Sequence, residues 1–259
     1  MLVDLHNHTS LCHHATGTPM QYVEAAIKTE CRYFGFSDHA PMAFDSRYRM
    51  SLELMETYEA MVQEAKMAYA DQIHVSLGYE VDFLRGYMEE KVLSRPCDYQ
   101  IGSVHFLGEW GFDNPEFIGE YKQRSIDTIW QDYFDAIEAM AKTRHFDIVG
   151  HFDLIKVFKF LPKKDVRLLA KNALMAIKKA NMVVEINTAG FRKPIKEQYP
   201  SALLLEEVAN LNIPITFSSD AHAPEHVGEG GEIVVALAKT FGYTKCAIFS
   251  NRERELITF

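Results

Sequence analysis

The chain has 259 residues, of which 47% are hydrophobic, so it is long enough to bury one barrel-sized core or two small ones. No linker-like stretch, low-complexity run or fixed-period repeat divides it, and we expect a single domain over residues 1–259. The formal net charge of -9 is spread along the chain, without a basic stripe of interleaved aromatic residues. A nucleic acid held along an extended surface is therefore not expected as a partner.

The amino-terminal segment and the cysteines give expectations about the compartment. The first twenty residues contain Asp4 and four histidines and lack an apolar stretch of signal-peptide length. No later segment reaches membrane-spanning length. The four cysteines are widely spaced without a Cys-x-x-Cys pair, which indicates reduced thiols, and Cys12 is interpreted as a packing residue. We expect a cytoplasmic protein without a membrane partner.

The first predicted strand alternates apolar residues with Asp4, His6 and His8, which therefore share one face. Side chains two residues apart on a strand point the same way, so His6 and His8 can share one metal ion. His14 follows six residues after His8. A His-x-His pair alone is more often an ordinary pair of surface or core histidines, so the interpretation depends on the rest of the chain.

The remaining chain repeats one pattern, in which an amphipathic helix is followed by an apolar strand that ends in polar residues. Helices are expected over residues 18–29, 51–68, 118–143, 165–179 and 201–209. Strands are expected over residues 32–39, 74–80, 98–105, 146–151, 182–188 and 214–222. Residues 246–249 are a further short apolar piece, which is either an eighth strand or part of a closing segment.

Strands that alternate with helices of this length predict right-handed βαβ units and an α/β fold. Seven such units in a row favour a closed barrel, and we predict a distorted (β/α)7 barrel that is TIM-barrel-like. An open doubly wound sheet is the alternative.

In a βα-barrel, functional groups gather at the carboxyl ends of the strands. The strand ends and the first loop carry the predicted metal ligands His6, His8, His14, His39, Glu80, His105, His151, Asp220 and His222. Each residue alone is more often a cap, a turn former or a surface group, but their coincidence at one end predicts a shared site. Imidazoles and carboxylates without a thiolate suit Zn, Mn or Fe in an open catalytic site, and nine ligands exceed one coordination sphere. The other four histidines, at 13, 74, 145 and 226, are interpreted as structural.

These residues resemble the motifs of the polymerase-and-histidinol-phosphatase (PHP) family of metal-dependent phosphoesterases, and the resemblance covers essentially the whole chain. The first motif is similar to residues 6–8 with His14, the second to residues 37–39, and Glu80 lies where the family has its bridging carboxylate. The resemblance implies three divalent metal ions. Their ligand sets would be His6, His8, Glu80 and Asp220; Glu80, His105 and His151; and His14, His39 and His222.

Within the family, residues 150–156, 185–194 and 218–222 resemble the stand-alone histidinol-phosphatase branch. This resemblance implies hydrolysis of a phosphate monoester, L-histidinol phosphate, with Glu80, Asp220 and Arg192 as catalytic residues. Because metal coordination lowers the pKa of water, we expect in-line attack by a metal-bound hydroxide. Arg192, just beyond a strand end, is well placed to bind phosphate oxygens with its two-pronged guanidinium. Lys156 lies where the branch often has a second phosphate-binding arginine. Asp153 is a candidate acid for the leaving group.

Two other classes of function stay open at the level of the sequence. A nucleotide phosphoesterase or single-strand nuclease of the same family is the main alternative, although the chain lacks a basic channel. A non-catalytic metal-binding module is the second alternative, and the complete set of ligands is evidence against it. The acidic residues Asp45 and Asp153 are candidates for binding the ammonium or imidazole of the substrate.

Overall fold

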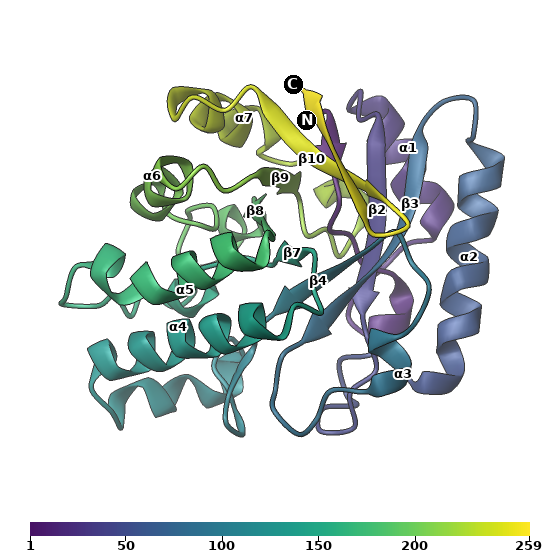
Figure 1. The fold of residues 1–259 in the computed structure, drawn as a ribbon. Helices are drawn as coiled ribbons and strands as arrows, with labels where there is room; N and C mark the ends of the chain where they lie inside the picture. The colour runs from purple at the N-terminus through teal and green to yellow at the C-terminus, as the bar shows by residue number, and fades with distance from the viewer.

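Seven parallel strands form one curved sheet at the centre of the molecule (Figure 1). The structure is a computed structural model and describes all residues, 1–259. The neighbours in the sheet follow the order β1-β2-β3-β4-β7-β8-β9. These strands are β1 (Val3–Asp4), β2 (Tyr33–His39), β3 (His74–Asp82), β4 (Tyr99–Ser103), β7 (Ile148–Val149), β8 (Val183–Asn187) and β9 (Ile215–Ser218).

The two outer strands of this order meet and nearly close the sheet into a barrel. Leu5, just after β1, donates its backbone N–H to the carbonyl of Phe217 in β9 at 3.1 Å, and Asn7 forms a parallel bridge with Ala221. The predicted α/β class and the TIM-barrel-like (β/α)7 architecture are therefore confirmed, and the open doubly wound sheet is excluded.

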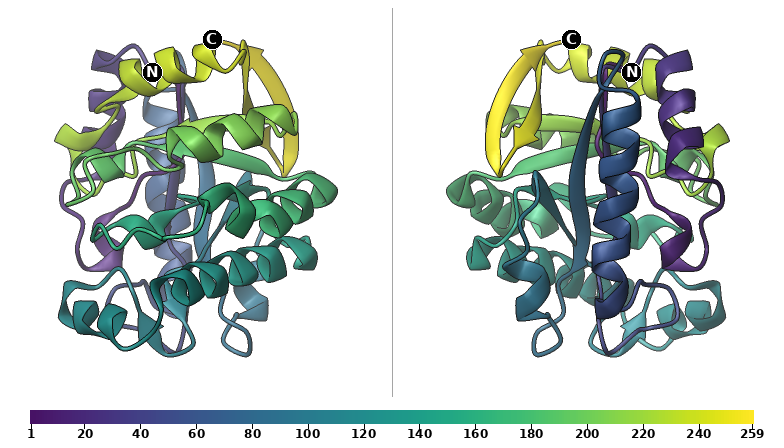
Figure 2. Two further views of the ribbon diagram at one scale, coloured as in Figure 1. Left: turned by 90° about the vertical axis from the view of Figure 1, so that its left-hand side faces the viewer. Right: turned by 90° about the vertical axis from the view of Figure 1, so that its right-hand side faces the viewer.

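Helices surround the barrel on its outside (Figure 2). They are α1 (Pro19–Lys28), α2 (Met55–Ala68), α3 (Glu90–Leu93), α4 (Ile126–Thr143), α5 (Val166–Ala180), α6 (Ala202–Asn210) and α7 (Gly231–Thr240), with short 3₁₀ turns η1 (Ser10–Cys12), η2 (Leu52–Leu54), η3 (Pro115–Lys122), η4 (Leu154–Lys156), η5 (Ala189–Phe191) and η6 (Pro224–His226). Their starts follow from the sequence: Thr18 caps α1 in a reciprocal capping box with Gln21, and Asp165 accepts from Arg167 N at the start of α5. No helix combines the length and the hydropathy that a bilayer crossing requires.

Two sequence predictions about individual elements are corrected. The single helix expected over residues 118–143 is a 3₁₀ segment, η3, followed by a break and then α4, which begins after Ser125. The first strand ends at Asp4, so His6 and His8 lie in the segment just beyond it rather than on it. The alternation of side chains continues there because Leu5 and Asn7 still make strand-like backbone contacts with the β9 side.

Residues 246–249 do not form an eighth barrel strand. They belong to β10 (Lys245–Ser250), which pairs antiparallel with β11 (Glu253–Thr258) outside the seven-stranded sheet. Arg252 in the turn between them donates to the carboxylate of Asp147 and, from its backbone, to the carbonyl of Asp98. Asp98 and Asp147 precede β4 and β7, so this hairpin covers the amino-terminal end of the barrel. A further short hairpin, β5 (Phe106–Leu107) and β6 (Trp110–Gly111), follows β4 at the opposite end.

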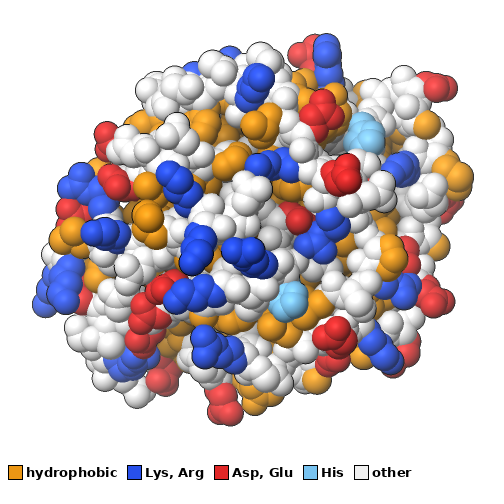
Figure 3. All heavy atoms as spheres, in the orientation of Figure 1, with side chains coloured by type: hydrophobic (Ala, Val, Ile, Leu, Met, Phe, Trp, Pro, Cys, Tyr) orange, Lys and Arg blue, Asp and Glu red, His pale blue; other side chains and the backbone are white.

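One hydrophobic cluster of 62 buried residues fills the space between the strands and the helices. It includes the aromatic side chains of Phe34, Tyr99 and Trp130, so burial of this apolar surface is the main stabilising contribution to the fold. Figure 3 shows Lys, Arg, Asp and Glu side chains scattered among hydrophobic and neutral atoms on the outer face of the molecule.

Candidate metal centre

The carboxyl ends of the barrel strands surround a cavity of about 780 Å³. Seven of the nine predicted ligands line it: His14, His39, Glu80, His105, His151, Asp220 and His222. The other two, His6 and His8, are fully buried beside it. His151 and Asp220 have positive φ angles of 23° and 51°, a conformation that costs free energy and is common at functional sites.

Glu80 lies at the centre of the histidines. Its Oε2 is 2.8 Å from His39 Nδ1 and 3.4 Å from His6 Nε2. Its Oε1 is 2.9 Å from His151 Nε2 and 3.6 Å from His105 Nε2. Because the two oxygens of one carboxylate face different imidazoles, Glu80 is in a position to bridge two cations.

The potential ligand atoms fall into overlapping groups, each with its atoms within 4.8 Å of one another. Three groups correspond to sets implied by the family motifs: His6, His8 and Glu80; Glu80, His105 and His151; and His14, His39 and His222. Asp220 lies next to the first group, with Oδ1 3.2 Å from His8 Nε2. Residues from most of the barrel strands therefore converge as the sequence predicts.

Several ligand atoms of these side chains are left free of hydrogen bonds, as expected for a metal-binding site. Buried polar atoms nearly always have a partner, yet His6 Nε2, His8 Nε2, His39 Nδ1 and Glu80 Oε2 lie 2.8 to 3.8 Å from one another or from Asp220 without the geometry of a hydrogen bond. All four face the cluster, where a divalent cation would accept their lone pairs. The imidazoles and carboxylates are therefore placed as ligands of a divalent metal, and ligands of these types suit Zn, Fe or Mn.

Three carboxylates that are not among the predicted ligands orient the histidines. A carboxylate can only accept here, so the imidazole Nδ1–H donates in each pair: His6 to Glu185 at 3.0 Å, His8 to Asp38 at 3.3 Å and His105 to Asp82 at 2.7 Å. Each of these contacts fixes the ring and directs Nε2 to the centre.

These orienting carboxylates are the main functional residues that the sequence analysis missed. Asp82 lies two residues after Glu80 on β3 and so shares its face, a signal that the alternation of the strand contains. Glu185 is a charged residue within the apolar, fully buried strand β8. Asp82 is itself held by a salt bridge from the buried Arg49, a contact between distant segments that no local pattern reveals.

The electrostatics of the cluster keep its carboxylates ionised. Burial alone would raise the pKa of Glu80, but His39, His6 and His105 hold it well below its ordinary value. The pKa of Asp220 is likewise lowered, against the effect of burial, by His6 and His8.

Comparison with known proteins agrees with this geometry. The model of the PHP domain family matches residues 4–189. The protein belongs to the PHP family.

Two curated relatives and one solved structure place it further within the PHP family. A probable histidinol-phosphatase of Deinococcus radiodurans is 43% identical over 232 residues, which cover 88% of each chain. The histidinol-phosphatase of Bacillus subtilis is 29% identical over 259 residues, covering 87% of this chain and 95% of the relative. The histidinol phosphate phosphatase of Lactococcus lactis subsp. lactis, solved with zinc, L-histidinol and phosphate, has a TM-score of 0.83 at 22% identity, with 98% of each chain covered. This last likeness shows the shared fold.

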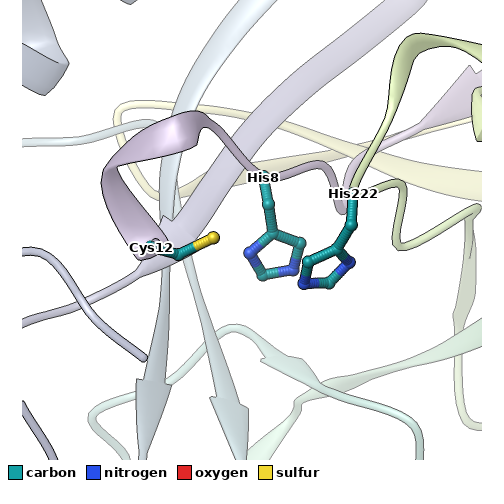
Figure 4. Close-up of side chains that lie close together, drawn as sticks. All are labelled: His8, Cys12 and His222. Atoms are coloured by element: carbon teal, nitrogen blue, oxygen red, sulfur yellow. The ribbon is translucent and has the colours of Figure 1, made fainter. Parts of the chain in front are cut away.

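Cys12 forms a further group of closely spaced potential ligands with His8 and His222. Its thiol is buried and donates to the carbonyl of Thr9 at 3.1 Å, and burial raises its pKa. Figure 4 shows Cys12 and His222 on opposite sides of the His8 ring, and the two imidazoles stack at 4.0 Å between centroids. The sulfur lies within 4.8 Å of ligand atoms of both histidines. A protonated thiol that donates to a backbone carbonyl agrees with the predicted packing role.

Arg192, which directly follows η5, lines the cavity of this PHP protein. Its Nη2 donates to the carbonyls of Ser219 at 2.6 Å and Asp220 at 3.0 Å, and Nη1 lies 3.4 Å from the exposed Glu229. These contacts hold the guanidinium beside the ligand Asp220 without using all of its five N–H groups.

Lys156 corrects a prediction, because the structure does not place it in the cavity. It is 1% exposed, and its ammonium is bound by Asp153 at 3.0 Å, Glu197 at 2.7 Å and the carbonyl of Gln198 at 2.7 Å. An ammonium has three donors, and all three are used. Asp153 shares this buried position, so it cannot reach a leaving group or the substrate's cation either. The structure thus gives Lys156 and Asp153 a structural role.

The cavity also contains residues that the sequence analysis left out or interpreted differently. His226, expected to be structural, lines the cavity, as does Tyr199. Asp45 lines it too, but lies 3.3 Å from Arg49 in a salt bridge. Tyr199 is twelve residues beyond β8 and reaches the centre through an antiparallel bridge with Asn187, a pairing that the strand pattern does not indicate.

Proposed function

We propose that the protein is a metal-dependent phosphatase that hydrolyses L-histidinol phosphate to L-histidinol and phosphate. The observation that carries this proposal is the cluster of histidines around Glu80, with its unpartnered ligand atoms at the cavity floor. The substrate is supported by the names of the relatives and by the Lactococcus lactis structure, which holds L-histidinol and phosphate.

The centre would hold three divalent ions, with Zn, Fe and Mn as the candidate metals. His6, His8, Glu80 and Asp220 would hold one, Glu80, His105 and His151 the second, and His14, His39 and His222 the third. When bound, such ions lower the pKa of coordinated water and neutralise charge on the phosphoryl group. The three groups of closely spaced ligand atoms support this arrangement.

The protein's own residues would bind and orient the phosphate monoester in this cavity. Arg192 is positioned to donate to phosphate oxygens that face away from the metal ligands, so the phosphorus would be held between its guanidinium and the ions. Attack by water would break the P–O bond to histidinol, and the leaving oxygen would take up a proton. Glu80 and Asp220 would contribute as ionised carboxylates that keep the cations in place.

The rim of the cavity supports a small substrate rather than a nucleic acid. Asp45, Asp113 and Glu116 line the cavity, together with Arg47, Arg49 and Lys193. Carboxylates at this position repel a polyanionic chain and suit a substrate whose organic part is cationic. Arg47 lies 3.6 Å from Glu116 and Arg49 lies 3.3 Å from Asp45, so Asp113 is the one of these three carboxylates without an ion pair.

Competition among phosphate monoesters tests the substrate. Metal-loaded protein should prefer histidinol phosphate over nucleotides and sugar phosphates in kcat/KM by at least about a hundredfold, which equals roughly 2.7 kcal/mol of differential transition-state binding. A preference for nucleotides or single-stranded DNA would instead support a nuclease and leave the metal assignments in place. Activity on no phosphate ester would contradict the proposal.

Two wider expectations belong with this proposal. We propose that residues 1–259 act as one domain, which is supported by the single hydrophobic cluster and by ligands as far apart as His6 and His222. A cytoplasmic location stays a prediction.

A further inference from the structure

Tyr199 is a buried side chain that lines the cavity and has an unpaired hydroxyl group. The side chain is 1% exposed and lines the cavity, yet its Oη has no hydrogen-bond partner. Buried tyrosine hydroxyls usually find a partner, and an unsatisfied one costs free energy. An unpaired phenol next to a binding site therefore suggests a partner that arrives with the ligand.

The protein holds this tyrosine firmly. Its backbone N–H donates to the carbonyl of Asn187 at 2.9 Å, and its carbonyl accepts from Asn187 N at 2.7 Å, which ties it to the end of β8. Its ring lies 5.2 Å from the ammonium of Lys156. That ammonium is fixed by Asp153 and Glu197, so the charge that packs against the ring is held in place.

We propose that Tyr199 Oη donates a hydrogen bond to a phosphate oxygen of the bound monoester, a role that rests on the proposed phosphatase function. Tyr199 and Arg192 both line the cavity, and the Tyr199 ring centroid is 6.4 Å from that of the potential ligand His151. A phosphate dianion accepts hydrogen bonds and donates none, so it is the complement of a phenol that has no other partner. In this account Lys156 serves the phosphate indirectly, as a positioning residue behind Tyr199.

The protonation state of the phenol suits this role. Burial, together with the negative charges of Asp153 and Asp220, raises the pKa of Tyr199 above its ordinary value. The hydroxyl therefore stays protonated across the working range of pH and acts as a donor. It does not act as a base.

The test is Tyr199→Phe, which removes only the hydroxyl. Direct titration calorimetry with inorganic phosphate on the metal-loaded protein should show binding weakened by about 10- to 100-fold, the range for one hydrogen bond to a charged group. The kcat/KM for the monoester should fall by a similar factor. Metal content and Tm should be unchanged or Tm slightly higher, because the lost hydroxyl has no partner in the protein. Phosphate affinity and kcat/KM both within about twofold of wild type would overturn the proposal.

A matched substitution, Tyr243→Phe, serves as the control. Tyr243 Oη donates to the carbonyl of Ile213 at 2.8 Å, and Tyr243 does not line the cavity. This variant should lose some stability and keep wild-type phosphate affinity; an equal loss of affinity in both variants would also overturn the proposal. Phosphate binding is measured without turnover, so wild type that binds phosphate but hydrolyses no monoester would refute the proposed function while still testing Tyr199.

Discussion

At the scale of single residues, the orientation of each imidazole matters as much as its presence. His6, His8 and His105 each donate Nδ1–H to a buried carboxylate and turn Nε2 to the cluster. His14 Nδ1 lies 2.8 Å from the carbonyl oxygen of Cys12. The ring of His14 is therefore also held at Nδ1, in this case by a backbone acceptor. Since the orientation of each ring is fixed in this way, little movement of the side chains is needed before metal binds.

We expect Glu80→Gln to remove nearly all turnover while the fold stays intact. The amide has almost the same shape, but it lacks the negative charge that would bridge two cations. Turnover of histidinol phosphate and metal content by elemental analysis provide the measurement. A variant with activity within about tenfold of wild type, or roughly 1.4 kcal/mol, would show that Glu80 is structural.

Asp82→Asn should weaken metal binding, because it removes the charged acceptor that fixes His105. Loss of such an orienting partner typically costs 10- to 100-fold in metal affinity, and about this factor is expected in competition with a chelator. Asp98→Asn is the matched control, since Asp98 accepts from the backbone N–H of Leu77 at the far end of the barrel. Equal metal affinity in the two variants would contradict the orienting role.

Arg192→Ala should lower kcat/KM by about 10- to 150-fold, the effect of losing one charge-assisted contact of about 1.5 to 3 kcal/mol. Metal content should not change, because the guanidinium contacts the ligand residue Asp220 only at its carbonyl. Arg167→Ala on the exposed surface of α5 controls for the loss of an arginine. Loss of metal from Arg192→Ala, or an unaltered kcat/KM, would show that the assignment to phosphate is wrong.

At the scale of elements, the barrel could be predicted from the sequence because each strand is an apolar run that ends in polar residues. The same signal located Glu80 on β3 and His39 on β2, since the polar residues stand at strand ends. It did not reveal Glu185 as a functional residue. The role of this buried carboxylate follows from its contact with His6, which lies 179 positions away in the sequence.

Elements that depend on tertiary packing were predicted less well. The first strand is only two residues long, because its continuation is held by contacts with Phe217 and Ala221 instead of by a regular ladder with β2. Lys156 was placed by analogy at the cavity, but its ammonium satisfies buried Asp153. No local periodicity distinguishes a lysine that faces a cavity from one that neutralises a buried carboxylate.

At the scale of the whole molecule, an acidic chain with a net charge of -9 concentrates its histidines and two ionised carboxylates at one end of a barrel. The hairpin β10–β11 covers the other end, where its Arg252 contacts Asp98 and Asp147. Metal ions would reverse the sign of the local charge and so attract a phosphate dianion to a protein that otherwise repels it.

Metal affinity should rise with pH. In the metal-free protein, burial alone would lower the pKa of His105, but Asp82 and Glu80 raise it to about 10, so the imidazole is protonated at neutral pH. Metal must displace this proton, and apparent affinity should increase by up to about tenfold per pH unit for each proton displaced, between about pH 6 and pH 8. Titrations in buffers of different ionisation enthalpy would count the protons released. Affinity that is flat with pH would contradict this linkage.

The central claim is that several metal ions act together in hydrolysing histidinol phosphate, and stepwise reconstitution tests it most directly. Metal-free protein would be titrated with Zn, Fe or Mn while bound metal and hydrolysis of histidinol phosphate are measured in the same samples. The account predicts that activity stays low at the first equivalent and reaches its plateau only at about three equivalents. Full activity with one bound ion, or with none, would contradict it.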